Sequence, residues 1–531
     1  MSRHLSTWIY WLVMIPVCVG MCQETKHAIQ PADTAGQLLS TISFAWQYPS
    51  EPSTLTTNSP VGKIINLPET WNLVTHILCK IISSPNSEPN THGSLQLSNQ
   101  LSQALNIVSR STGYAQLSFQ KHCLASVVLG VQTKTNLEQS QLDNLLRVCQ
   151  TIATRVKPDS EKVHATVAYS TFSNGWVVFA IAQDPQKLIQ SHTTQIQQGR
   201  SFLTRALPGK TNWVTTEITG SIAKQLIGYL LPHTISSNPT NILVRITLEK
   251  DFVRTFCQIS YSNSLPNDRS TWNPPTNLVE EPLVGFLAAK GIKPLLTNLS
   301  SVIGLPPNQI PDQLFYWTTD GLLCQGYLAW PSPNPKEDLQ TLHTQTFEKY
   351  RAKLWNSLET EVVFTNDILF WDGLPFLRPF ARYATNSHGN FVVVGLAYVE
   401  GKRKKVPPAL FAQFSSNPRI FIYSWEYTPA VLFQARNITQ LARLLMGIEQ
   451  IPAESPWWKW VDTAMPYLGE TVTSAQYTAT RTITILRRSN CLLSGWEIVA
   501  LANLSEGCKP ELRTKSRTTS RLNHAPDYNK K

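Results

Sequence analysis

The sequence predicts an α+β protein made mostly of antiparallel sheets, with hairpins, interspersed helices and, as a further hypothesis, two related halves. Three observations predict this class. Short apolar runs are paired around polar bends, as in antiparallel hairpins. A capping residue followed by proline recurs where helical patterns begin. Apolar residues make up 42% of the 531 residues, a fraction typical of a globular protein with a packed core.

The first 22 residues have the pattern of a secretory signal peptide. Arg3 and His4 precede an apolar run from Trp8 to Cys22, and a cleavage site before Gln23 fits the small residues near its end. The run is short for a membrane span, which needs about 20 residues. Lipidation of Cys22 and retention as an anchor stay open. We expect export, to the periplasm, the cell surface or the medium.

Composition divides the rest of the chain into three segments. The Pro- and Asn-rich run 262–282 separates an N-terminal α+β half, 23–270, from a C-terminal α+β half, 275–508. Residues 509–531 form a basic tail that we expect to be disordered. The stretches "NGWVVFAIA" (174–182) and "SGWEIVALA" (494–502) share Gly-Trp and a closing Ala-x-Ala. On the two-halves hypothesis both are strands in equivalent places, with Trp176 and Trp496 buried.

Helix starts are marked by four capping residues that each precede proline: Asp184, Asn334, Thr428 and Ser455. Helices are predicted after Pro335, from Pro429 to a C′ glycine at Gly447, and over 99–110 and 141–156.

Strands are predicted around turn residues. One hairpin is predicted over 163–182, with its bend at Ser-Asn-Gly, and a second over 313–330, with its turn at Asp320-Gly321. A third hairpin is predicted over 480–502. Two single strands are also predicted: one ends near Val399, and the other covers 419–427.

Charge and cysteine content exclude several classes of site. The net charge is +11, but the tail 509–531 holds seven basic residues against two acids, and "GKRKK" (401–405) has the pattern of a solvated loop. We expect no nucleic-acid partner, and at most a weak contact of the tail with an anionic membrane. Seven cysteines follow the leader without a CxxC pair, so no zinc ribbon or thioredoxin site is indicated, and disulfide pairing stays undetermined.

Acids beside aromatic residues are the remaining route to an enzyme. Four such acids are present: Asp320, Asp372, Glu426 and Glu497. A glycoside hydrolase needs two carboxylates about 5–10 Å apart. However, Asp320-Gly321 and Asp372-Gly373 are typical of turns, and Glu426 and Glu497 each follow a tryptophan as if on the opposite face of a strand. We expect Asp372 to lie in a turn, facing solvent or capping its own backbone.

Four segments in this order, "EEPLVGFLAAKGIKPLL", "PDQLFYWTTDG", "FWDGLPFLRPF" and "YSWEYTPA", resemble a family of uncharacterised exported proteins of verrucomicrobial bacteria. The resemblance covers roughly residues 160–505, and its motifs are strands and turns. It implies export and a bacterial origin, and it supplies no activity.

The functional expectation is a non-enzymatic exported protein that binds or scaffolds another component. One alternative is a polysaccharide-active hydrolase that pairs Asp372 with a second acid. The other is a peripheral membrane-surface protein. No catalytic, cofactor-binding or metal-ligating residue is assigned, and no cofactor is expected.

Overall fold

The structure is a computed structural model that describes most of the chain between Ser40 and Glu506. The described residues are 40–47, 59–82, 92–109, 111–120, 123–132, 138–153, 165–172, 175–198, 212–224, 239–249, 251–265, 270–297, 306, 309–320, 325–347, 361–365, 367–373, 378–386, 389–396, 404–445 and 447–506. The predicted leader and basic tail lie outside these ranges.

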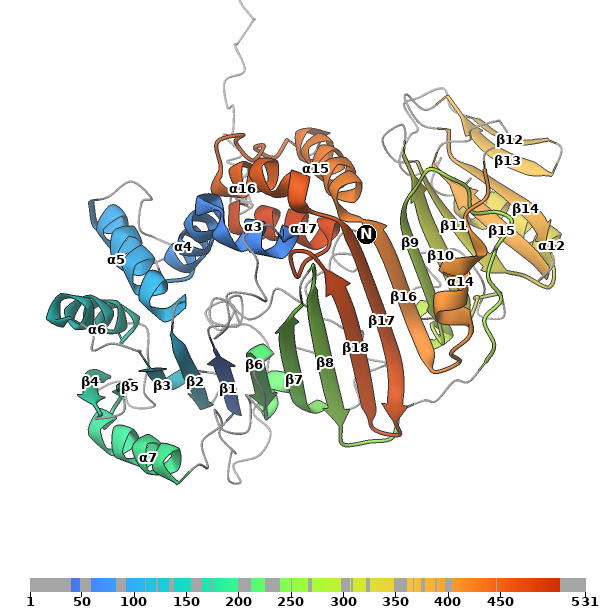
Figure 1. Ribbon diagram of the computed structural model, residues 1–531. Helices are drawn as coiled ribbons and strands as arrows, with labels where there is room; N and C mark the ends of the chain where they lie inside the picture. The colour runs from blue at the N-terminus through green and yellow to red at the C-terminus, as the bar shows by residue number, and fades with distance from the viewer. Residues whose placement is uncertain are drawn as a thin grey trace, which may run out of the picture.

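The described strands form one sheet of 18, and every pairing in it is antiparallel (Figure 1). One side of the sheet comes from the N-terminal part of the chain, in the spatial order β4 (Thr166–Thr171), β5 (Trp176–Ala182), β3 (Cys123–Gln132), β2 (Thr112–Gln120), β1 (Ser40–Trp46), β6 (Asn212–Thr219), β7 (Pro239–Leu248) and β8 (Val253–Tyr261).

The C-terminal part continues the same sheet. From β8 outward its strands are β18 (Thr482–Ser489), β17 (Glu470–Ala479), β16 (Ile420–Tyr427), β9 (Leu283–Lys290), β10 (Gln313–Thr319), β11 (Gly326–Pro331), β15 (Gly389–Gly395), β14 (Phe380–Asn386), β13 (Ile368–Asp372) and β12 (Glu361–Thr365). The two parts therefore meet at the β8–β18 pair, where Cys257 lies opposite Ile485.

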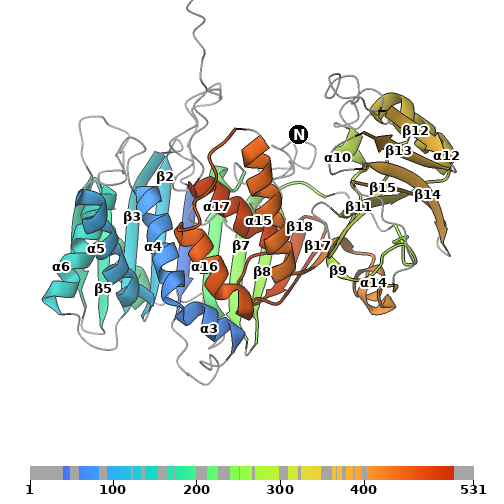
Figure 2. The same cartoon turned by 90° about the horizontal axis from the view of Figure 1, so that it is seen from above.

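A helical layer covers one face of the sheet from the β4–β5 edge to β16 and β9 (Figures 1 and 2). Its members are α3 (Pro60–Asn66), α4 (Pro68–Ile82), α5 (His92–Ser109), α6 (Gln139–Ala153), α15 (Thr428–Leu445), α16 (Pro456–Ala464) and α17 (Gly495–Glu506). The opposite face carries α7 (Pro185–Gln197) against β5 and α14 (Pro408–Ser415) against β16. The remaining helical turns are α10 (Lys293–Thr297), α12 (Pro335–Thr341), a π-helical turn (Leu342–Phe347) and a 3₁₀ turn (Met465–Tyr467).

Helices from both ends of the chain share one core. Leu73 of α4 is buried together with Trp458 of α16 and Ile498 of α17. At the rim of this core, Glu506 of α17 accepts hydrogen bonds from two α4 side chains, His76 at 2.8 Å and Lys80 at 2.7 Å. The helical layer thus bridges the two parts of the sheet.

Most local predictions are confirmed. The hairpins β4–β5 and β10–β11 pair as expected. The side chains of Asp184 and Ser455 cap α7 and α16, because each accepts a hydrogen bond from the backbone N–H three residues later in the chain. Gly447 has a φ of 66°, as a C′ glycine requires. Asn334 precedes α12 but makes no side-chain cap bond.

The predicted hairpin over 480–502 is wrong in its second half. β18 pairs with β17, and the stretch from Gly495 is the helix α17. The reason is a capping box: Ser494 accepts from the N–H of Glu497 at 3.3 Å, and the Glu497 carboxylate accepts from the N–H of Ser494 at 2.8 Å. Trp176 is a buried strand residue, whereas Trp496 is a half-buried helix residue, so the two Gly-Trp stretches are not equivalent strands.

Two runs of elements nevertheless have the same order. β1, the helices α3 to α5, β2, β3 and α6 follow one another, as do β16, the helices α15 and α16, β17, β18 and α17. In each run the three strands lie side by side in chain order.

Two further features bear on the expected export of the protein: its helix hydropathy and its cysteines. None of the helices in the described ranges is long and apolar enough to cross a membrane. Cys79, Cys149, Cys257 and Cys491 are free thiols.

Candidate functional site

Two of the four acids singled out by sequence lie at strand ends. Asp320 is exposed at the end of β10, and its N–H donates to the Pro282 carbonyl at 2.9 Å. Asp372 ends β13, and its carboxylate pairs with Arg378, with Nε–Oδ1 at 2.5 Å and Nη2–Oδ2 at 3.2 Å. The guanidinium of Arg378 lies 4.2 Å from the centre of the Phe370 ring. Asp372 therefore binds a cation that the sequence analysis did not name.

The predicted turn at Trp371-Asp372-Gly373 is wrong for its first two residues, which are strand residues of β13 paired with β12. The backbone of Gly373 still predicts a contrast between two substitutions. Gly373 has a φ of 86°, so Gly373→Val should destabilise the protein by about 1–2 kcal/mol, since a β-branched residue is disfavoured at positive φ. Asp372→Asn should cost less than about 1 kcal/mol, because the Asp372–Arg378 pair is partly open to solvent. Urea unfolding of both variants measures this, and a costlier Asp372→Asn would contradict it.

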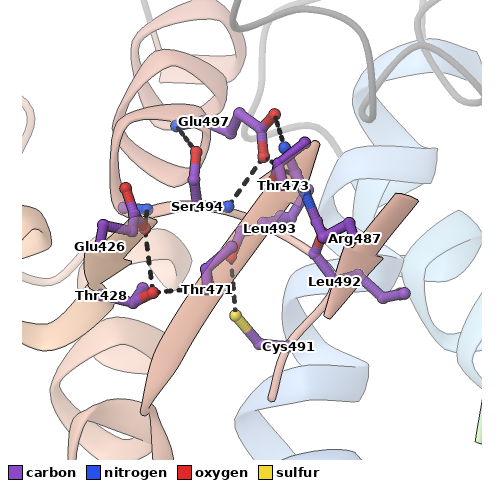
Figure 3. Close-up of polar contacts among 11 residues, drawn as sticks. Glu426, Thr428, Thr471, Thr473, Arg487, Cys491, Leu492, Leu493, Ser494 and Glu497 are labelled. Carbon is purple, nitrogen blue, oxygen red and sulfur yellow. Dashed lines mark hydrogen bonds and ion pairs between the residues drawn. The ribbon is translucent and has the colours of Figure 1, made fainter. Parts of the chain in front are cut away.

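The other two acids meet in the interior, contrary to the prediction that they are surface residues of two strands. Glu426 of β16 is 6% exposed and Glu497 of α17 is 3% exposed. Strand alternation places Glu426 on the face of the sheet that α15 and α17 cover, opposite Thr471 of β17 and Gly285 of β9. Glu497 reaches the same region from the first turn of α17. Figure 3 shows both acids in one polar cluster.

Glu497 is bound on both carboxylate oxygens. Arg487 of β18 donates from Nη1 to Oε2 at 2.5 Å and from Nη2 to Oε1 at 2.9 Å, a bidentate pair (Figure 3). Arg487 also donates to the Thr473 hydroxyl at 2.9 Å and to the Leu492 carbonyl at 3.0 Å. The guanidinium therefore ties β18 to β17, to the loop before α17 and to α17 itself.

Among the residues that the structure describes, no cation is paired with Glu426. Its Oε1 accepts from the N–H of Gly495 at 2.7 Å and from the Thr428 hydroxyl at 2.9 Å, and Thr428 is also bonded to Thr471 at 2.8 Å (Figure 3). Burial, and to a smaller extent the charge of Glu497, raises the pKa of Glu426 to about 7, against the lowering effect of these bonds and of Arg487.

Gly495 is where the two helices touch. A Cβ at this position would lie 2.8 Å from the backbone nitrogen of Leu432 and 3.0 Å from the Val431 side chain. The N-terminus of α17 therefore packs directly on the first turns of α15, and the carboxyl group of Glu426 bonds to both helix starts.

The polar cluster can bind a proton near neutral pH, on Glu426. Both of its acids are almost fully buried, and Glu497 is already saturated by Arg487 and the Ser494 N–H. Cys491 is nearby, and burial raises the pKa of its thiol to about 12, so it stays protonated at neutral pH. The described residues hold no group of three potential ligands suited to a metal ion.

A second feature lies on the outside of the same two helices. Phe433 and Leu444 of α15 are each 61% exposed, and Leu441 is 43% exposed. At about 100° per residue these three positions fall within an arc of about 80°. Ile448 and Leu504 are also exposed. These five residues are called the α15–α17 apolar face below.

The C-terminal ends of α15 and α17 lie close together. Arg443 of α15 donates to Asn503 of α17 at 3.1 Å, and it also binds the Glu449 carbonyl. Because Leu444 and Leu504 are the chain neighbours of this bonded pair, exposed apolar side chains occur at the same end of both helices. Helix α17 ends at Glu506, and the basic sequence 509–531 begins three residues later.

Comparison with known proteins adds no relative. No protein-family model matches the chain, and neither a curated protein nor a solved structure matches it significantly.

Sequence reasoning missed Arg487 and the α15–α17 apolar face. A signal for the first was present: the Ser494-x-x-Glu497 capping pattern places an acid where a helix starts, shortly after the consecutive basic residues Arg487 and Arg488. The second needed the packing of α15, because Phe433, Leu441 and Leu444 look like core residues until the buried side of the helix is known.

Proposed function

We propose that the protein is a non-enzymatic exported binding protein that docks on an anionic lipid surface through the α15–α17 apolar face and the basic tail. The observation that carries this proposal is the position of that face. Its large apolar side chains include Leu504 near the end of α17, and in the sequence a segment with seven basic and two acidic residues follows that helix.

An anionic lipid surface fits both parts of this arrangement. An exposed apolar helix face lying at a membrane interface buries its side chains among the acyl chains. A neighbouring polybasic segment is attracted to acidic headgroups, at about 1 kcal/mol for each basic residue close to the surface. Stable peripheral binding generally takes two such signals, and this chain has both, an exposed apolar helix face and a basic segment that follows α17 in the sequence.

The hydrolase alternative lacks such support. Asp372 is paired with Arg378 near the surface, and the acids that do meet, Glu426 and Glu497, lie beneath helix starts with little exposure. A retaining or inverting mechanism needs two carboxylates that reach a sugar. The export part of the proposal is supported by the sequence of residues 1–22.

We also propose that the chain arose by an internal duplication. The support is the matching order of elements from β1 to α6 and from β16 to α17. The two Gly-Trp stretches do not support it, because one is a strand and the other a helix. A matching backbone path when the two runs are superposed in an experimental structure would test it.

Docking is tested by co-sedimentation with vesicles of phosphatidylcholine, alone or mixed with phosphatidylglycerol. The full chain without its leader should bind the mixed vesicles and be released by salt, because screening weakens the contribution of the tail. The double substitution Phe433→Gln, Leu444→Gln should weaken binding by about tenfold or more, since each side chain loses about 1.5–3 kcal/mol of apolar burial.

The matched control replaces Phe364 and Leu396, which are 52% and 45% exposed on other parts of the sheet, by glutamine. This control should bind like the wild type. Equal loss in both double variants, or no loss in the first, would contradict docking through α15. A change of oligomeric state confined to the Phe433, Leu444 variant would instead identify the face as a contact between copies of the chain.

A further inference from the structure

We infer that protonation of Glu426 fixes α15 against α17 and thereby favours docking of the α15–α17 apolar face. The docking part of this inference rests on the proposed function, whereas the packing part stands on the geometry of the cluster alone. The inference assigns a regulatory role to an acid that no catalytic or binding function uses.

The first step is the position of Glu426 at a contact between two helices. Its Oε1 accepts from the Gly495 N–H of α17 and from the Thr428 hydroxyl of α15 (Figure 3). At the same point Gly495 packs against the backbone of Leu432 with no room for a Cβ. A carboxylate that draws water to itself must therefore separate α15 from α17 at this close contact.

The second step is the balance of charges around Glu426. Arg487 faces it from β18, Glu497 from α17 and the neutral Cys491 thiol from the loop between them. β17 and β9 place the uncharged Thr471 and Gly285 opposite it, and Glu470, the neighbour of Thr471, points to the other face of the sheet. The first charged residue of α15 is Arg436, which pairs with Asp462. Since Arg487 is already bound by Glu497, the charge on Glu426 stays largely uncompensated.

The third step is the sign of the pH effect. The pKa of Glu426 is raised from its ordinary value of 4.5 to about 7 in the folded protein. The folded state therefore binds this proton more tightly than an opened state does, and its stabilisation is complete below pH 4.5 and is lost as the pH rises through 7. Solvent supplies the proton and takes it back, and no other group needs to change its charge.

The last step connects the cluster to the surface. Thr428 begins the helix that carries Phe433, Leu441 and Leu444, and Arg443 holds the far end of that helix to Asn503 of α17. Loosening the junction of α15 and α17 displaces Leu504 of α17 relative to the other residues of the apolar face, which belong to α15 and the segment after it. Docking is then strongest in mildly acidic conditions.

Amide hydrogen exchange of the full chain without its leader tests the packing step without any lipid. After correction for the intrinsic effect of pH, protection of α15 and the first turns of α17 should fall about tenfold between pH 6 and pH 8. Glu426→Gln, which keeps the shape and the acceptor of the protonated acid, should remove this dependence. Glu470→Gln, an exposed acid on the neighbouring strand, should keep it. Protection that does not change with pH in the wild type, or that still changes in Glu426→Gln, overturns the inference.

The docking step is tested with the same variants and phosphatidylglycerol-containing vesicles. The wild type and Glu470→Gln should bind several-fold more tightly at pH 6 than at pH 8, and Glu426→Gln should bind equally at both. Wild-type binding that is strong but independent of pH overturns the link to docking. Absence of vesicle binding at every pH refutes the proposed function, and hydrogen exchange still decides the packing step.

Discussion

Replacing Arg487 by methionine should destabilise the protein by about 3–5 kcal/mol, the range expected when one partner of a buried ion pair is removed. The change leaves the Glu497 carboxylate buried with only the Ser494 N–H as a bonded donor, close to a second buried acid, Glu426. It also releases the Thr473 hydroxyl and the Leu492 carbonyl, which Arg487 binds. Urea unfolding at pH 7.5, followed by circular dichroism, measures the loss.

The double variant Arg487→Met, Glu497→Gln is the control, because it removes both charges together. A buried ion pair costs much of its attraction in desolvation, so the double variant should be more stable than the single one. The single variant should also lose less stability at pH 5 than at pH 7.5, since protonation of Glu426 removes the second buried negative charge beside the unpaired Glu497 carboxylate. An exposed pair of this kind would be worth under about 1 kcal/mol, and a loss that small would contradict the buried geometry.

The elements that sequence predicted correctly are those decided by neighbouring residues. Asp184-Pro185 and Ser455-Pro456 begin helices because a side-chain acceptor and a proline without an N–H both suit a first turn. The β4–β5 and β10–β11 hairpins follow from alternating apolar residues on both sides of polar bends. These interactions span a few residues, so the local sequence contains them.

Contacts between distant segments were not predictable in this way. The pairing of β8 with β18 joins residues more than two hundred positions apart, and nothing in either strand marks the other as its neighbour. The stretch from Gly495 illustrates the same limit at short range. Its alternating apolar residues suit a strand, but the capping box and the packing of Gly495 on α15 decide for a helix.

Sequence analysis misjudged the burial of Glu426 and Glu497, and the candidate site shows why. Asp320 and Asp372 precede glycines at strand ends, and such positions are usually near solvent whatever the fold. Glu426 lies within a strand, where alternation defines two faces but does not say which one a helix covers. α15 and α17 cover the face that carries Glu426, and this depends on the tertiary arrangement alone.

Trp458→Ala should cost about 3–5 kcal/mol, because it opens a large cavity in the core that the helices from both ends of the chain share. Trp458 is fully buried in α16, among side chains that include Leu73 of α4 and Ile498 of α17. The guanidinium of Arg436 lies 4.5 Å from the centre of its ring. Removing the ring therefore weakens the attachment of α4 to α16 and α17, besides losing buried apolar surface. Urea unfolding at pH 7.5 measures the cost.

Trp458→Phe removes the indole N–H but keeps an aromatic ring in the core. The Nε1 of Trp458 is buried and has no hydrogen-bond partner among the described residues, so phenylalanine removes none of the bonds seen there and fills most of the space. We expect it to cost less than half as much as alanine. Because the shared core joins helices from the two parts of the chain, α4 and α17 should both lose hydrogen-exchange protection in Trp458→Ala. Loss confined to α16 would show that the two parts are held together by the β8–β18 pairing and not by this core.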